Sequence, residues 1–187
     1  VSEEKKKLVQ VAKECLDVGL KEVKPWGFLG DMGQAINDYA EEHGYTIVRE
    51  IGGHGDTTMI PLSRLATYKG VPVTQLLDKE VLDKVVADTM VGGATLTKML
   101  GTSAWYAPGA AAAYVAEAII RDQKKVVPCS VYLEGEYGES NICIGVPVVL
   151  GRTGWEKVID FKLNDEETAL FKASAEAVRK TNSALSL

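Results

Sequence analysis

The chain has 187 residues, of which 46% are hydrophobic and 25% charged, and its formal net charge is −5. These values are typical of a globular protein and exclude a disordered chain, a collagen-like repeat and a coiled coil. The acidic balance predicts no nucleic-acid partner, and the longest apolar stretch, Ala110–Ile120, is too short to span a membrane. Three cysteines without metal-binding spacing and a charged N-terminus without a leader pattern predict a cytoplasmic protein.

The first fifty residues predict a helix, a second helix and a strand. The first helix begins after Ser2, which can cap it, and ends near Lys24 because Pro25 follows. Its apolar residues recur at helical spacing: Leu8, Ala12, Cys15, Gly19 and Val23. The second helix is predicted over Gly30–His43 and the strand over Tyr45–Glu50.

The middle of the chain predicts helices separated by glycine-rich loops. A tight loop is expected over Ile51–Asp56, followed by irregular structure over Thr57–Pro72. A helix capped by Asp78 is expected over Lys79–Met90; it is interrupted at Gly92 and Gly93 and then continues to Leu100. A loop over Gly101–Pro108 then leads to an alanine-rich helix over Gly109–Lys124.

The last third changes from helical to strand periodicity. Three β-rich runs, Val126–Leu133, Ile142–Leu150 and Trp155–Leu163, are separated by short turn segments and predict an antiparallel meander. Asn164 and Glu167 have the spacing of a capping box and predict a final helix to about Ser183. Helices, a meander and a last helix together indicate an α+β fold.

Acid–base chemistry near neutral pH has two histidine candidates. His43 lies at a predicted helix end, where a cationic ring suits the helix dipole and needs no functional explanation. His54 lies between glycines in Gly52-Gly53-His54-Gly55-Asp56, directly after a predicted strand. Glycines there allow tight turns and the close approach of a ligand, although a buried loop histidine held by backbone groups remains the alternative.

Residues 52–187 resemble the C-terminal catalytic domain of malate dehydrogenase in the lactate/malate dehydrogenase family. The resembling stretches, in family order, are Gly52-Gly53-His54-Gly55-Asp56-Thr57, Met59-Ile60-Pro61-Leu62, Gly92-Gly93-Ala94, Gly101 to Pro108, Pro128-Cys129-Ser130, Gly135 to Gly138, Gly145 to Val148 and Leu163 to Glu167. The resemblance implies that His54 accepts the hydroxyl proton of malate, that the Ser103 loop contacts substrate, and that NAD accepts the hydride.

Residues 1 to about 55 instead resemble an internal segment of a methionine aminopeptidase. The resembling stretches are Val23 to Gly27, Gly30 to Ile36, His43-Gly44-Tyr45 and Val48 to Gly55. His54 therefore matches the catalytic base of one family and a metal ligand of the other. We expect two segments, 1–51 and 52–187, joined at Gly-Gly-His-Gly as in a chimera.

The position of the junction determines which catalytic groups of the dehydrogenase family have counterparts in this chain. In the dehydrogenase family an orienting Asp, the substrate arginines and the dinucleotide-binding domain precede the histidine, whereas residues 1–48 contain no arginine. Asp31 and Asp38 are the acids of the second predicted helix that could approach His54, and Arg49 is the arginine nearest to it in the sequence, but a chance replacement of the orienting Asp is not expected. We therefore expect a catalytically incomplete malate dehydrogenase-type domain that binds no NAD and, at most weakly, a small dicarboxylate.

Two further functions stay open at this point. The first is a non-enzymatic folded module that forms homo-oligomers through exposed apolar surface. The second is a metallopeptidase fragment, in which His54 would be a ligand of a divalent metal. A two-metal centre needs several carboxylates beside that histidine, and the residues after His54 follow the dehydrogenase pattern instead.

Overall fold

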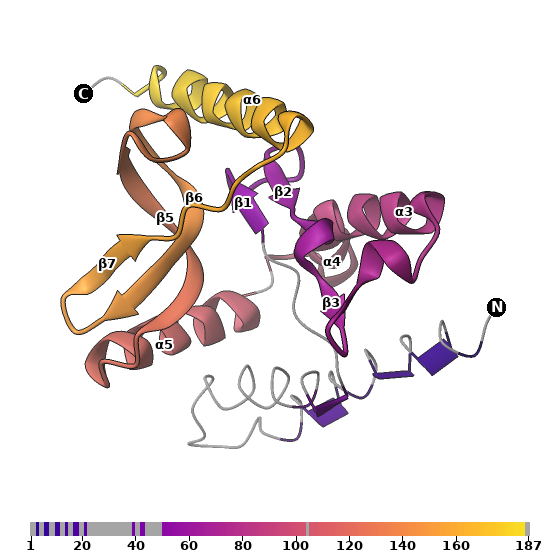
Figure 1. Cartoon of the computed structure of the whole chain (residues 1–187). Coiled ribbons are helices and arrows are strands. Elements are labelled where there is room, and N and C mark those ends of the chain that lie inside the picture. The colour runs from indigo at the N-terminus through magenta and orange to yellow at the C-terminus, as the bar shows by residue number, and fades with distance from the viewer. Residues whose placement is uncertain are drawn as a thin grey trace.

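A five-stranded antiparallel sheet forms the centre of the computed structural model, which describes residues 50–103 and 105–185 together with isolated residues between Glu3 and His43. Its strands are β1 (Glu50–Gly52), β2 (Met59–Pro61), β5 (Lys125–Glu134), β6 (Ser140–Gly151) and β7 (Gly154–Val158). Strand β6 is central, because it pairs with β5 along one edge and with both β1 and β7 along the other. Figure 1 shows this arrangement.

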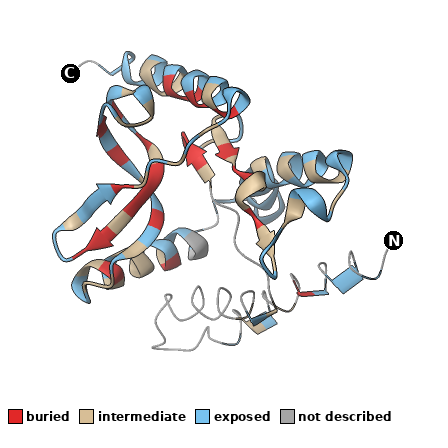
Figure 2. Ribbon diagram, viewed as in Figure 1, coloured by how far each residue is buried: buried red, intermediate tan, exposed pale blue. Residues whose placement is uncertain are grey.

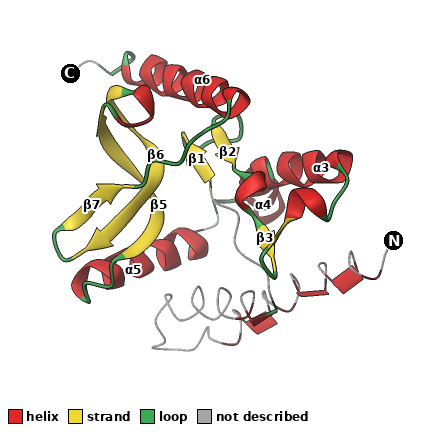
Figure 3. Ribbon diagram, in the orientation of Figure 1, coloured by secondary structure: helices red, strands yellow, loops and turns green. Residues whose placement is uncertain are grey.

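Four helices accompany this sheet in the described part of the chain: α3 (Lys79–Met90), α4 (Gly92–Leu100), α5 (Tyr106–Ile120) and α6 (Asp165–Asn182). Helix α6 packs against β1, β2 and β6, whereas α5 packs against β6 near the other end of the sheet. Helix α3 contacts β2 and α4, on the far side of β1 and β2 from the long strands (Figure 3).

Short elements connect β2 to α3. They are a two-stranded sheet of β3 (Thr67–Tyr68) and β4 (Val71–Pro72), and single 3-10 turns at Ser63–Leu65 and Val73–Gln75. A third such turn, Glu136–Gly138, joins β5 to β6.

The core lies between the long strands and α6, where Figure 2 shows the buried residues following β6. Alternate residues of β5 and β6 point inward, as the period of a strand requires. The buried cluster comprises Ile51, Ile60, Leu62, Ala118, Val127, Val131, Leu133, Ile142, Ile144, Val146, Val148, Leu150, Val158, Phe171 and Ala175.

The predicted α+β fold with its antiparallel meander is confirmed, and so is the last helix. The side chain of Asn164 accepts a hydrogen bond from the Glu167 N–H at 2.8 Å, and the Glu167 carboxylate accepts one from the Asn164 N–H at 3.0 Å. These reciprocal bonds are the predicted capping box. The bounds of α3 are also as predicted, but Asp78 occupies its N-cap position without a side-chain hydrogen bond.

Several predicted boundaries are wrong. Gly92 and Gly93 do not interrupt the helix but are the first two residues of α4. Helix α5 begins at Tyr106 rather than Gly109, because Pro108 lies in its first turn, where a backbone N–H has no helical partner to lose. It ends at Ile120 because Asp122 and Lys124 have positive φ. Strand β7 ends at Val158 rather than Leu163: the Tyr137 hydroxyl takes up the next backbone groups, donating to the Ile159 carbonyl and accepting from the Phe161 N–H.

The remaining predictions concern the start of the chain. The apolar stripe, the helix over 30–43 and the strand over 45–49 lie largely or wholly outside the described residues. The described single residues there, such as Val11, Lys21 and Tyr39, are helical, and His43 lies in the turn that ends the second predicted helix. The Tyr39 hydroxyl donates to the Glu14 carboxylate at 2.9 Å, which joins the two predicted helices.

No helix in the described ranges is both long and apolar enough to cross a membrane.

Candidate functional site

His54 lies in a six-residue loop, 53–58, that joins β1 to β2. The hairpin register pairs Gly52 with Met59, so β1 continues through Gly52, whereas the sequence predicts the loop to begin at Ile51. The backbone of Gly53 is buried while the side chain of His54 is exposed to solvent. The loop therefore presents the imidazole at the end of a hairpin whose strands belong to the central sheet.

Two glycines allow this hairpin to lie against β6. Gly52 has φ +99°, a backbone conformation that favours glycine, and a Cβ there would lie 2.5 Å from the Thr58 carbonyl oxygen. A Cβ on Gly145 would lie 2.6 Å from the carbonyl oxygen of Gly52, its pairing partner. The sequence motifs around both glycines thus correspond to one close contact between β1 and β6.

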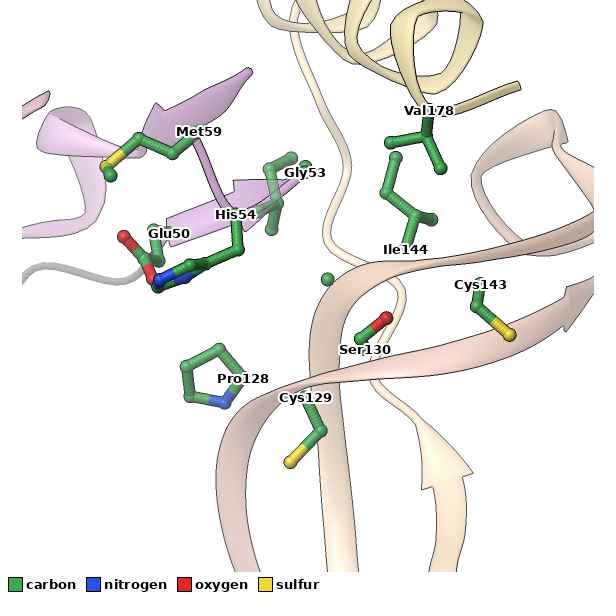
Figure 4. A pocket seen from close by; sticks show the side chains of 13 residues that line it. Glu50, Gly53, His54, Met59, Pro128, Cys129, Ser130, Cys143, Ile144 and Val178 are labelled. Carbon is green, nitrogen blue, oxygen red and sulfur yellow. The ribbon is translucent and has the colours of Figure 1, made fainter. Parts of the chain in front are cut away.

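A cavity of about 420 Å³ opens beside His54 (Figure 4). Its lining comes from β1 and its loop, from the facing parts of β5 and β6, and from Val178 of α6. Glu50 and His54 lie on the same side of it in Figure 4, with Pro128 facing them. The other polar side chains among the described lining residues belong to Ser130, Cys129 and Cys143, and these described residues include neither lysine nor arginine.

The two cysteines of this lining lie on opposite faces of the β5–β6 hairpin. Cys129 pairs with the buried Val146, whereas Cys143 is exposed and pairs with Tyr132. Burial raises the pKa of the Cys129 thiol, which keeps it protonated at neutral pH. A thiol in that state is a poor nucleophile, so Cys129 contributes apolar surface rather than reactivity.

Of the two predicted site residues, the structure places only His54 in the cavity. Ser103 is exposed in the loop between α4 and α5 and does not line it. Within the described ranges, no side-chain hydrogen bond orients the His54 imidazole. Asp31, Asp38 and Arg49, which the sequence offers as replacements for the missing partners, lie outside the described residues.

Sequence reasoning missed two residues of this region, Glu50 and Ser174. Glu50 shares a strand face with Gly52, because strand residues two apart point to the same side, so its position beside the loop could have been inferred. Ser174 is 4% exposed and lies on the apolar face of α6 with Phe171, Ala175 and Val178. A serine on an apolar helical stripe is the signal that marks it in the sequence.

An ion pair attaches the start of α6 to the segment that follows β2. Arg64 Nε donates to Glu167 Oε1 at 2.5 Å, and Arg64 Nη2 donates to the Lys162 carbonyl at 2.7 Å. Burial acts to raise the pKa of Glu167, but hydrogen bonds from Arg64 and the Asn164 N–H outweigh it, so the pKa is lowered. Glu167 is therefore ionised at neutral pH and holds α6 over the β1–β2 hairpin.

Taken over the described residues alone, the donor set of this site fits neither a metal centre nor a dinucleotide. Within the described part of the chain, no three His, Cys, Asp or Glu side chains are grouped so that they could hold a metal ion. A pyrophosphate needs cationic side chains or a glycine-rich turn before a helix, and the cavity lining offers Glu50 as its charged residue beside His54. The residues described here can hold and expose an imidazole for proton transfer.

Comparisons with known proteins agree with the fold. The family profile of the lactate/malate dehydrogenase α/β C-terminal domain matches residues 36–184. The malate dehydrogenase of Bacteroides fragilis is 73% identical over 135 residues, which cover 72% of this chain and 43% of that protein. The chain thus spans less than half the length of the curated relatives it matches.

Solved structures give the same result. The malate dehydrogenase of Salinibacter ruber superimposes with a TM-score of 0.72 at 44% identity, covering 77% of this chain and 48% of that one. A lactate dehydrogenase from Cryptosporidium parvum, solved with lactic acid and nicotinamide adenine dinucleotide, gives 0.71 at 33% identity, covering 75% and 46%. The chain belongs to the lactate/malate dehydrogenase family, and residues 36–184 correspond to the α/β C-terminal domain of that family.

Proposed function

We propose that this domain serves the interconversion of malate and oxaloacetate, with His54 as the group that accepts the hydroxyl proton. The observation that carries the proposal is the exposed imidazole on the β1–β2 loop, beside a cavity, in a chain that is 73% identical to a malate dehydrogenase over 135 residues. The family implies NAD as the hydride acceptor, and the relative from Cryptosporidium parvum was solved with that cofactor.

In this mechanism the chain contributes a base rather than a binding pocket for the anionic groups of the substrate. A neutral imidazole can take a proton from a hydroxyl and return it in the reverse direction. Among the described residues, the cavity lining offers no lysine or arginine to hold two carboxylates. We therefore propose that the 187 residues alone do not turn over malate, bind NAD or bind the dicarboxylate more than weakly.

The second part of the proposal concerns the origin of residues 1–51. Their resemblance to a methionine aminopeptidase supports a chimeric junction at Gly52–Gly55. The dehydrogenase family match begins at residue 36 and so includes part of this segment. In this proposal the aminopeptidase-like residues serve as a lead-in to β1 and carry no peptidase chemistry.

A replacement experiment tests the dehydrogenase function. Malate-dependent reduction of NAD is measured for the 187-residue chain and for a hybrid whose residues 1–49 are replaced by the region that precedes the matching segment in the Bacteroides fragilis enzyme. We expect no turnover by the first and turnover by the second, abolished by His54→Asn. A hybrid that folds and binds NAD but is inactive contradicts the role of His54.

Turnover by the unmodified chain, lost on His54→Asn, would overturn the proposed incompleteness. It would mean that residues such as Asp31, Asp38 or Arg49 rebuild the site. Peptide hydrolysis with added divalent metal, lost in the same variant, would favour the aminopeptidase alternative.

A second candidate function, a non-enzymatic module that self-associates, is favoured by one specific observation. Large apolar side chains are exposed on and beside α4: Val91 (45%), Leu96 (44%), Met99 (79%), Leu100 (55%) and Trp105 (62%). Exposed apolar surface of this kind favours association. Light scattering of the purified chain measures it, and a monomer at all concentrations would remove this candidate.

A further inference from the structure

The hydroxyl of Ser174, on α6, lies directly beneath the His54 loop. Its Oγ accepts a hydrogen bond from the Gly53 N–H at 2.8 Å and donates one to the Thr58 carbonyl at 2.7 Å. Gly53 and Thr58 are the first and last residues of the loop. One side chain from a helix more than a hundred residues away therefore joins both ends of the loop.

The loop completes this connection through its own backbone. The Gly55 N–H donates to the Gly53 carbonyl at 3.1 Å, and the Thr58 N–H donates to the Gly55 carbonyl at 3.0 Å. These bonds and the two bonds of Ser174 form a closed ring. His54 is the central residue of the three-residue turn between Gly53 and Gly55, so its Cα position is fixed from both sides.

The glycines before His54 make room for this hydroxyl. A Cβ on Gly52 would lie 2.9 Å from Ser174 Oγ, and a Cβ on Gly53 would lie 3.1 Å from a methyl carbon of Val178. The approach is close enough that Gly53 is buried. Without the Ser174 hydroxyl, the Gly53 N–H and the Thr58 carbonyl would face α6 without that partner, which is costly for a buried backbone group.

We propose that Ser174 is a positioning residue for His54: it fixes the backbone of the loop and so determines where the imidazole enters the cavity. This inference rests on the proposed function for the role of His54 as proton acceptor. The placement of the loop itself rests on the hydrogen bonds of Ser174 alone. Ser174 acts through Gly53 and Thr58 and does not contact the reacting atoms.

Nuclear magnetic resonance of the full chain tests this, because its two histidines give two imidazole signals. His54→Asn assigns them, and His43 then serves as an internal reference. In Ser174→Ala we expect the Gly53 amide to exchange with solvent about tenfold faster than in the parent chain, the effect of one lost hydrogen bond. We expect the His54 signal to shift or broaden while the His43 signal stays unchanged.

Two controls separate positioning from general stabilisation. Ser183→Ala removes another hydroxyl, which bonds to the Lys180 carbonyl at the exposed end of the same helix, and should change neither signal. Ser174→Thr retains the hydroxyl and should restore the protection of Gly53. If Ser174→Ala does not fold, Ser174→Cys, whose thiol bonds weakly, provides the same comparison.

The proposal is overturned if Gly53 exchange is unchanged, or if it accelerates by the same factor as core amides such as that of Val146, which would show a merely structural role. It is also overturned if the His54 signal does not respond. None of these measurements requires turnover. Their outcome is therefore independent of whether the domain proves to be a malate dehydrogenase.

Discussion

The two sides of this domain differ in how far their own residues pack. On one side, α6 and the long strands bury most of the core, including Phe171, Val146 and Val148 at 1% exposure or less. On the other side, α3 and α4 bury none of their residues and expose several large apolar ones. Hydrophobic burial is the main source of folding free energy, so the first side carries most of the stability.

This difference divides the predicted site. His54 lies on the well-packed side, where β1, β2 and α6 hold its loop by pairing and by the Ser174 hydroxyl. Ser103 follows α4 on the poorly packed side and is exposed. A base can be held in place by this domain alone, whereas Ser103 is exposed to solvent in its loop.

The largest expected effect comes from removing the aromatic ring of α6 from the core. Phe171→Ala should lower the free energy of unfolding by about 3–5 kcal/mol, because it removes buried apolar surface and leaves a cavity. Leu170→Ala, next to it on the exposed face, should cost only about 0.5 kcal/mol. Urea denaturation measures both. Equal losses would mean that α6 does not pack as the structure shows.

The hairpin that carries His54 should be nearly as sensitive. Gly52→Ala should cost about 2–4 kcal/mol, because strain at φ +99° adds to the overlap with the Thr58 carbonyl. Gly70→Ala is the matched control: Gly70 also has positive φ, at +80°, but no atom lies near its Cβ position. It should cost about 1 kcal/mol, the strain alone. If the two variants lose equal stability, β1 does not lie against the loop as described.

The ion pair that attaches α6 to the segment after β2 should have a smaller effect that depends on pH. Glu167→Gln should cost about 1–2 kcal/mol at neutral pH, since the carboxylate is largely buried but Arg64 is partly exposed to solvent. The folded-state pKa of Glu167 lies below its ordinary value of 4.5, so its contribution is present above that value and is lost as the pH falls through the folded-state pKa.

Thermal unfolding at a series of pH values measures this contribution. The parent chain should lose more stability than Glu167→Gln as the medium becomes acidic, and the two should converge there. Asp83→Asn breaks the exposed ion pair with Lys79 and is the control, with little expected change at any pH. A parallel pH dependence of the parent chain and Glu167→Gln would contradict the assignment of a lowered pKa to this carboxylate.

The sequence predicts those elements whose signals are local. Period-two alternation identifies β5 and β6, and the spacing of Asn164 and Glu167 identifies the start of α6, because each signal lies within a few residues. The end of β7 could not be predicted, since the Tyr137 hydroxyl, far along the chain, takes up the Ile159 and Phe161 backbone groups.

The site shows the same division between local and distant signals. The glycines around His54 identify the loop, whereas its attachment to Ser174 depends on a hydrogen bond between residues 121 positions apart. No motif within either segment predicts that the two segments are in contact. The resemblance to the dehydrogenase family identified His54 and Ser103, but it did not indicate that this structure would place only His54 in the cavity.

The smallest expected change in the free energy of unfolding comes from α4, on the poorly packed side of the domain. Met99 is 79% exposed, so Met99→Gln should change the free energy of unfolding by no more than about 0.5 kcal/mol. The same substitution removes exposed apolar surface and should reduce self-association, measured by light scattering over a range of concentrations. Lys98→Gln, which changes the neighbouring residue without removing apolar surface, is the control and should alter neither. If Met99→Gln lowered the free energy of unfolding by nearly as much as Phe171→Ala, α4 would have to pack against another part of this chain. Both sides of the domain would then contribute to its stability.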